Sequence, residues 1–226
     1  MDKSTSVSQA VAARHSVRAY LDKPVDPALL RQVLTKALRA PSNSNIQPWQ
    51  VHLVTGDTLA RLKAATADRA IFPPQFDHPA YPIYPDPLSE TYKDRRFDCG
   101  ERQYGARGID RDDREGRLRY VYGNHQFFGA PAGLFLYAEP ACGLSQWADL
   151  GIFLQTVMLL LKEEGLDSCA QISWAMVGQT VRQVLRVRPE LMLYCGLAIG
   201  YADMSDPINQ IATPRASFDD VVTIHE

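Results

Sequence analysis

Two arginines stand close together near the N-terminus, in the segment Arg14-His15-Ser16-Val17-Arg18. Whether the segment is a helix end or an extended turn, this spacing lets both guanidiniums converge on one anion. Ser16 and backbone N–H groups would add donors, and the planar fork of arginine suits a phosphate group. The segment therefore predicts a phosphate site, with two ordinary surface arginines as the alternative interpretation.

A second polar segment, PSNSNIQP, lies between Pro41 and Pro48. Side-chain amides carry a donor and an acceptor at fixed separation, so this loop could bind the N3–H and carbonyl edge of a pyrimidine-like ring. The two prolines would reduce the entropy lost when the loop is ordered. Because Ser, Asn and Pro are also common turn formers, a plain turn explains the loop equally well. A further arginine, Arg215, stands alone in the polar C-terminal segment and has no meaning by itself.

The composition indicates one globular domain over residues 1–226. The chain is 46% hydrophobic with a formal net charge of −2, so it has no basic field to attract nucleic acid or an anionic membrane. We expect a cytoplasmic protein, since the N-terminus lacks the apolar stretch of a secretory signal and the longest apolar run, Gly151 to Leu161, is too short for a bilayer. The four cysteines form no CxxC pair, and we expect reduced thiols without a metal.

Helices and strands alternate along the chain, as an α/β or α+β fold requires. The clearest helix starts at Asp26, an N-cap residue followed by proline, and the most apolar one ends at Gly165. That apolar helix would lie in the core, either of the monomer or of a dimer. We expect helices at about 27–40, 58–69, 145–164 and 178–187, and strands at 49–55, 132–138, 191–201 and 221–224.

Residues 72–120 differ in composition from the rest of the chain. Six prolines between residues 72 and 87 exclude a helix there, and Phe76, Tyr81 and Tyr84 accompany them. Residues 94–119 then carry seven acidic and eight basic side chains, whose charges nearly cancel. This balance favours a solvated helical face or a mobile excursion over a polyanion site.

Taken together, the polar segments resemble the FMN-dependent nitroreductase family. The resemblance rests on the order and spacing of several short motifs. These are RHSVRAY starting at Arg14, APS starting at Ala40, Asn45, QPW starting at Gln47, GLD starting at Gly165, GLAIGY starting at Gly196, Asn209 and Arg215. It covers most of the chain but not residues 72–120. It implies a three-layer α/β/α fold of the α+β class, with a mixed, mainly antiparallel sheet. It also implies an intertwined homodimer with FMN at the subunit interface, which would suit the apolar helix 145–164.

The resemblance also assigns roles to residues. Arg14, Ser16 and Arg215 would hold the FMN phosphate, with His15 beside them. Arg18 would lie near N1 and O2 of the flavin, where a fixed positive charge stabilises the negative charge of the reduced ring. The remaining expected contacts are Pro41, Ser42, Asn43, Asn45 and Gln47 from the other subunit's loop, Asn124 at the pyrimidine edge, and the backbone of Ala170, Gln171, Ile172 and Ser173 opposite flavin N5.

The implied activity is ping-pong oxidation of NAD(P)H followed by reduction of a nitroaromatic compound or a quinone. The insertion at 72–120 would be a lid over the acceptor or an arm around the partner subunit. Three alternatives stay open: a relative with another acceptor, such as a flavin, enone or halogenated-aromatic reductase; a non-catalytic FMN-binding protein; and a structural domain. The sequence does not distinguish NADH from NADPH.

Overall fold

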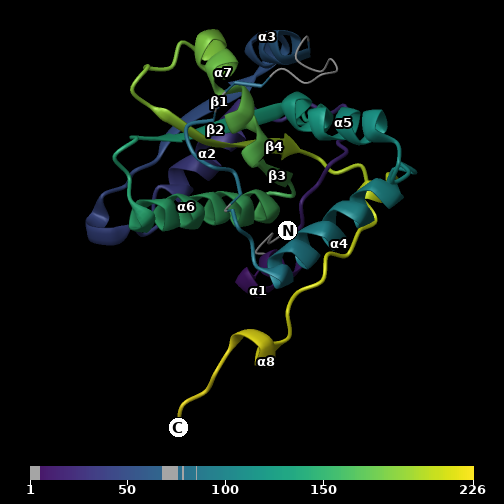
Figure 1. Cartoon of the computed structure of the whole chain (residues 1–226). Helices are drawn as coiled ribbons and strands as arrows, with labels where there is room; N and C mark the ends of the chain where they lie inside the picture. Colours follow the sequence, from purple (N-terminus) through teal and green to yellow (C-terminus); the bar gives the residue numbers. More distant parts are fainter. Residues whose placement is uncertain (1–5, 68–75, 78, 85) are drawn as a thin grey trace.

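A four-stranded sheet forms the middle layer of the structure (Figure 1). The computed structural model describes residues 6–67, 76–77, 79–84 and 86–226. The strands β1 (Gln50–Thr55), β2 (Ala132–Ala138), β3 (Asp167–Gln171) and β4 (Met192–Gly200) are arranged in the order β1-β2-β4-β3. Every neighbouring pair is antiparallel, so the expectation of a mixed sheet was wrong for the strands of this chain. Among the described residues, parallel pairing is confined to a bridge between Ser16 and Ser168.

Helices cover both faces of this sheet, which gives the expected α/β/α layers (Figure 1). Side chains of β2 alternate between the faces, and all of them are buried. Leu134 and Leu136 pack with α2 (Pro27–Ala37) and α6 (Leu144–Glu163). Phe135 and Tyr137 pack with α3 (Gly56–Ala67) and α7 (Gly178–Leu185). The remaining helices are α1 (Val7–Ala13), α4 (Glu90–Ala106), α5 (Arg114–Tyr122), α8 (Phe218–Val221) and the short 3₁₀ helices η1 (Asn43–Asn45), η2 (Gly123–Gly129), η3 (Ile172–Val177) and η4 (Pro207–Gln210).

The predicted elements of the core are confirmed, with shifted ends. The Asp26 side chain accepts a hydrogen bond from the Ala28 backbone and begins α2, as predicted. That helix ends at Ala37, several residues before Pro41. Gly165 follows α6 with a φ of +73°, a left-handed backbone that favours glycine after a helix. The helix predicted at 58–69 begins at Gly56, and its last two residues lie outside the described part of the chain.

The predicted C-terminal strand at 221–224 is wrong. Phe218–Val221 forms a single helical turn, and the residues after it have no strand partner within the described chain. The tail runs away from the body and reaches none of the chain's own sheet edges (Figure 1). Within this chain, residues 221–224 therefore have no neighbouring strand with which to form backbone hydrogen bonds.

Helix α6 has the length and the apolar composition of a membrane span, which corrects the expectation that no segment is long enough. Its inner face is buried against the sheet and α2 through Leu150, Phe153 and Val157. Its outer face exposes Ile152, and Leu144 at its first turn is also exposed. The packed inner face is that of a core helix in a three-layer fold.

The insertion crosses the molecule and then forms two helices. Residues 72–75 lie outside the described residues; the described part of 76–87 has no helix, as its prolines predict. Asp77 accepts hydrogen bonds from two backbone N–H groups at the start of α7, and the Tyr81 hydroxyl donates to the Tyr194 carbonyl. The chain then runs across α6 to the start of α4 (Figure 1). The charged half of the insertion forms α4 and α5, which confirms the predicted helical structure of this part.

Candidate functional site

A cavity of about 630 Å³ opens between the N-terminal segment, α4 and the C-terminal segment. We call it the arginine pocket, because the guanidinium-bearing side chains of Arg14, Arg18, Arg102 and Arg215 line it, together with His15 and Ser16. None of the described residues that line the pocket is acidic. A concave site with several positive charges and no lining carboxylate favours an anion. Five of the predicted phosphate and flavin residues therefore meet in one place.

The segment from Arg14 to Tyr20 is joined to the edge strand β3 by a bridge between Ser16 and Ser168, and Tyr20 forms a second bridge with Ala202, beyond β4. The Val17 backbone N–H donates to the Ser168 carbonyl at 3.1 Å, and the Val17 side chain is fully buried. Alternation along an extended chain turns Ser16 and Arg18 to the side opposite Val17. Arg18 Nη1 also donates to the Ser16 carbonyl at 3.2 Å. The core thus determines which way the polar residues of this motif face.

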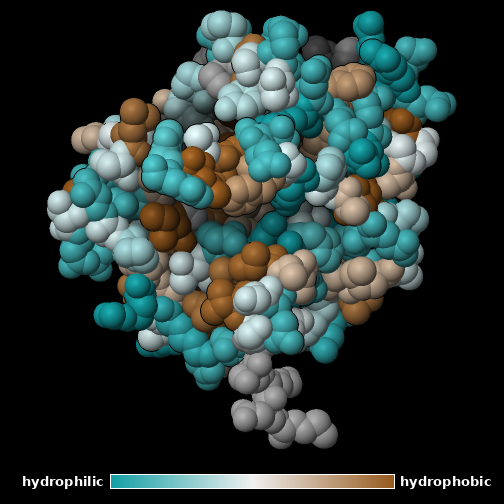
Figure 2. Space-filling model, turned by 90° about the horizontal axis from the view of Figure 1, so that it is seen from below, coloured by the Kyte–Doolittle hydropathy of each residue, from teal (hydrophilic) through white to brown (hydrophobic). Residues whose placement is uncertain are grey.

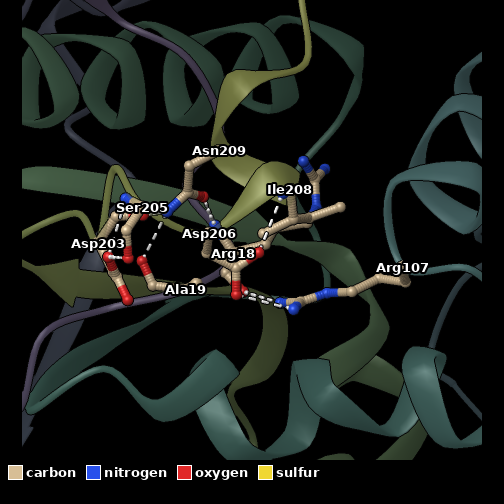
Figure 3. A network of polar contacts seen from close by, with 8 residues as sticks. All are labelled: Arg18, Ala19, Arg107, Asp203, Ser205, Asp206, Ile208 and Asn209. Atoms are coloured by element: carbon tan, nitrogen blue, oxygen red, sulfur yellow. Dashed lines mark hydrogen bonds and ion pairs between the residues drawn. The ribbon is translucent and has the colours of Figure 1, made fainter.

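Asn209 of η4 fixes the backbone beside Arg18 (Figure 3). Its side chain is 3% exposed and accepts a hydrogen bond from the Arg18 backbone N–H at 2.7 Å. Its amide nitrogen donates to the carbonyls of Ala19 and Asp203, both at 2.8 Å. All of these groups are partly buried, and the three bonds restrain this turn together with the bond from the Asp203 N–H to the Ala19 carbonyl at 3.0 Å. The sequence marked Asn209 through the family resemblance but gave it no role.

Arg107, at the end of α4, joins the same network (Figure 3). Its Nη1 donates to Asp206 Oδ2 at 2.8 Å, and its Nη2 donates to the Arg18 carbonyl at 3.2 Å. The insertion is thereby tied to both chain segments that build the pocket. Sequence reasoning missed Arg102 and Arg107, because the charges of residues 94–119 were interpreted as a solvated face.

Several donors around the arginine pocket lack a strong partner. The Arg14 guanidinium has no hydrogen-bond or ion-pair partner in the described part of the chain. Arg215 donates to the carbonyls of Thr213 and Pro214, within its own turn. His15 Nδ1 lies 3.1 Å from the Ala13 carbonyl, while its buried Nε2 contacts no partner among the described residues. These groups fit a phosphate group, which would supply the missing acceptors.

A sequence profile described as "Nitroreductase family" matches residues 11–201. The chain belongs to the nitroreductase family. It is 34% identical to nitrobenzene nitroreductase of Ectopseudomonas oleovorans over the whole length of both chains. It is 37% identical to 4-nitrobenzoate reductase of Pseudomonas putida, over 91% of this chain and 89% of that relative.

Crystal structures extend this likeness to the fold. The FMN and NADPH-dependent nitroreductase NfnB from Sphigopyxis sp. strain HMH is 45% identical, with a TM-score of 0.94 over 98% of this chain and 100% of that chain. NfnB from Mycobacterium smegmatis, solved in complex with NADPH, is 31% identical with a TM-score of 0.89, over 98% of this chain and 100% of that chain. The chain therefore has the α+β fold of a nitroreductase.

In this nitroreductase chain, the polar loop does not line the arginine pocket. Asn43, Asn45 and Gln47 of the loop are exposed, as is Pro41, while Ser42 is half-buried. The loop is held by two long-range contacts. The Asn43 backbone N–H donates to Asp149 Oδ1 on α6 at 2.9 Å, and Trp49 stacks on Phe153 of the same helix at 4.9 Å. The loop is a fixed structure that presents its amides outward.

The turn expected opposite flavin N5, Ala170 to Ser173, is bonded to η2. Gln171 is 1% exposed; it donates to the Asn124 carbonyl at 3.1 Å and accepts from Trp174 Nε1 at 3.1 Å. This side chain is therefore bonded within the protein, and the contact between Gln171 and Asn124 joins β3 to η2. Ala170 is exposed and Ile172 is half-buried.

His125 supports the same turn from beneath. Its Nε2 lies 3.0 Å from the Ser173 carbonyl, so this nitrogen is the one that carries the proton. Burial lowers the pKa of His125, which favours the neutral ring. The Ser173 hydroxyl is buried without a hydrogen-bond partner in the described chain. The sequence gave no signal for His125 beyond its position next to Asn124.

Proposed function

We propose that the protein is an FMN-dependent oxidoreductase that oxidises NAD(P)H and reduces nitroaromatic compounds. The observation that carries this proposal is the convergence of Arg14, His15, Ser16, Arg18 and Arg215 on one cavity. Curated relatives at 34% and 37% identity are a nitrobenzene nitroreductase and a 4-nitrobenzoate reductase, and a structural relative at 45% is FMN and NADPH-dependent. These likenesses support both the cofactors and the class of acceptor.

Different residues of the pocket would bind different parts of the cofactor. Arg14, Ser16 and Arg215 would hold its phosphate through charge-assisted hydrogen bonds, with His15 Nε2 beside them. Arg18 would place a fixed positive charge at the ring, and Asn209 holds its backbone so that the charge needs no reorganisation during the reaction. When bound, FMN supplies the redox chemistry, taking hydride from the nicotinamide and passing electrons to the nitro group.

We also propose that the active form is a homodimer. The polar loop presents its amides away from the chain's own arginine pocket, which supports their use by a second copy. Hydrophobic patches surround a hollow on the face seen from below (Figure 2). Val7 and Val11 of α1 and Ile152 of α6 are exposed apolar side chains of two helices that pack together. Exposed apolar surface of this kind favours an interface.

The C-terminal tail supports the same assembly. Phe218, Val221 and Ile224 are each at least 60% exposed on a tail that leaves the body (Figure 1). Strand β1 is an edge strand, and an apolar groove of about 470 Å³ beside it is lined by Val51 and Leu53. The tail of a second copy would cover this groove. We expect a dimer by light scattering during gel filtration, and a weaker dimer when residues 217–226 are removed; a monomeric full-length chain would contradict this assembly.

The catalytic proposal is tested by absorbance between 300 and 550 nm on the purified protein. We expect flavin bands that bleach with NADPH in the absence of oxygen and return when nitrobenzene is added. A protein that binds FMN without turnover would keep its bands in NADPH. A protein that neither contains nor binds FMN would overturn the proposed function.

A further inference from the structure

Helix α4 forms one wall of the arginine pocket, although it comes from the insertion that the family motifs leave uncovered. Cys99, Arg102 and Gln103 line the pocket. Their spacing places them on one face of the helix, toward the cavity. Arg14 and Arg215, from the N-terminal and C-terminal segments, line the same pocket. The insertion is therefore a structural part of the anion site in this chain.

Some N–H donors of the Arg102 guanidinium have no partner in the described chain. Its Nε donates to Asp98 Oδ2 at 2.7 Å, one helical turn earlier. Neither Nη1 nor Nη2 has a hydrogen-bond partner among the described residues. A guanidinium carries five N–H donors in a rigid fork, so the bond to Asp98 orients the fork and leaves its outer edge for a ligand. The ion pair is nearly half-exposed and by itself contributes little to stability.

Helix α4 is anchored well enough to hold Arg102 in place. Arg107 ties its C-terminal end to Asp206 and to the Arg18 carbonyl (Figure 3). Beside Arg102, Gln103 accepts a hydrogen bond from the Tyr120 hydroxyl at 2.9 Å, and Glu101 pairs with both terminal nitrogens of Arg117. Contacts on either side of Arg102 therefore fix the helix to α5 and to the pocket. A donor held this way loses little entropy when it binds.

From these contacts we infer that Arg102 is a further phosphate-binding residue of the cofactor site, contributed by the insertion. This inference rests on the proposed FMN function. A phosphate monoester carries between one and two negative charges at neutral pH. Arg102 would add a fork to those of Arg14 and Arg215 and close the pocket on the side of α4. The insertion then serves the phosphate end of the cofactor, besides any contact with the acceptor.

The test compares FMN with riboflavin, which lacks the phosphate. Flavin-free protein is titrated with each flavin, and the quenching of flavin fluorescence gives the dissociation constants. We expect Arg102→Ala to weaken FMN binding about tenfold, equivalent to about 1.4 kcal/mol, and to leave riboflavin binding unchanged. Arg102→Lys keeps the charge and should recover part of the loss.

Arg119→Ala is the matched control. Arg119 makes the same kind of ion pair, with Glu115 four residues earlier at 2.9 Å, but on α5 and outside the pocket. We expect its FMN affinity to equal that of the unmodified chain. Arg102→Gln, which keeps the length of the side chain and removes the charge, serves in place of Arg102→Ala if the alanine variant does not fold.

The outcomes separate this inference from the proposed function. If the unmodified chain binds no FMN, the proposed function fails first. If it binds FMN, and Arg14→Ala loses affinity while Arg102→Ala does not, the function stands and the role of Arg102 is refuted. An equal loss of FMN and riboflavin affinity in Arg102→Ala would also refute it, since the side chain would then support the pocket without contacting phosphate.

Discussion

The arginine pocket and the polar loop Pro41–Pro48 are two polar regions that the sequence marks with similar strength, but the chain builds them in different ways. Residues far apart in sequence converge in the pocket, and the bond from Arg18 to Asn209 spans 191 positions. The loop is made of consecutive residues and is closed mainly by local bonds, such as that from the Gln47 N–H to Ser42 Oγ at 2.9 Å. The pocket encloses a cavity, whereas the loop exposes its polar side chains on the surface of the protein.

In the proposed homodimer, this difference shows which half of the cofactor site one chain can build by itself. The pocket already gathers positive charge and unpaired donors around a cavity. The loop holds Ser44, Asn45 and Gln47 at positive φ, between 50° and 55°, with exposed side chains that enclose nothing in their own chain. Backbone strain of this kind clusters at active sites and ligand clamps.

Removing Asn209 should have the largest effect on the pocket. Asn209→Ala removes three hydrogen bonds in a site where the asparagine is 3% exposed. We expect the free energy of unfolding to fall by about 3 kcal/mol, about 1 kcal/mol for each bond. Urea denaturation gives this value. Asn209→Asp keeps the acceptor for the Arg18 N–H but turns a buried carboxylate oxygen toward the Ala19 and Asp203 carbonyls, so it should lose at least as much. A loss well below 1 kcal/mol in Asn209→Ala would show that the three bonds contribute little.

Arg215 and Asn45 test the two regions against each other. We expect Arg215→Ala to weaken FMN binding by about 1.5 to 3 kcal/mol, the scale of a charged hydrogen bond, and to leave riboflavin binding unchanged. Asn45→Ala, in the loop, should weaken both flavins alike, because an amide at the ring or ribityl chain does not sense the phosphate. Fluorescence titration measures both. The comparison fails if Arg215→Ala weakens riboflavin as much as FMN.

The core of the fold could be predicted from the sequence because its signals are local. Asp26 and Pro27 begin α2, Gly165 ends α6, and β2 occupies the predicted 132–138. Each depends on residues within a few positions of one another. Local signals could not decide whether residues 221–224 form a strand, because a strand requires a neighbouring strand and the tail has none within the described chain.

The site was predictable in part, for a related reason. Arg14, Ser16 and Arg18 lie together in a motif, and their convergence with Arg215 followed from the resemblance. The roles of Arg102 and Arg107 were hidden, because they are two of fifteen charged residues in the segment 94–119 and the sequence does not say which of these face the pocket. Helix docking decides this, and docking depends on contacts such as the one between Arg107 and Asp206.

Asp149 tests what holds the loop in place. Its side chain is 4% exposed; Oδ1 accepts the Asn43 N–H, while Oδ2 is buried without a partner in the described chain. We expect Asp149→Ala to cost about 1.5 kcal/mol, because the Asn43 N–H is left unpaired. Asp149→Asn keeps an acceptor and should stay close to the unmodified chain in urea denaturation. If the asparagine variant loses as much, the second carboxylate oxygen of Asp149 matters for stability as well as the bond to Asn43.

The smallest effect should come from Ser44, whose φ of 50° lies in the left-handed region. That region costs an L-residue about 1 to 2 kcal/mol, and glycine avoids this cost but loses about 0.5 to 1 kcal/mol in entropy. We therefore expect Ser44→Gly to raise the free energy of unfolding by about 0.5 kcal/mol. Gly56→Ala is the reciprocal control, since Gly56 has a φ of +52° with open space around it and should lose stability through conformation alone.

The same Ser44→Gly variant distinguishes a strained loop that serves binding from one that is merely tolerated. If the loop contacts the flavin of the partner, a glycine loosens it, and FMN and riboflavin affinity should both fall slightly while the chain becomes more stable. Opposite signs in the two measurements would indicate that the loop is kept rigid for its ligand. A gain in stability with unchanged affinity for both flavins would count against a role for the loop's rigidity, and would leave the arginine pocket as the region that determines cofactor binding.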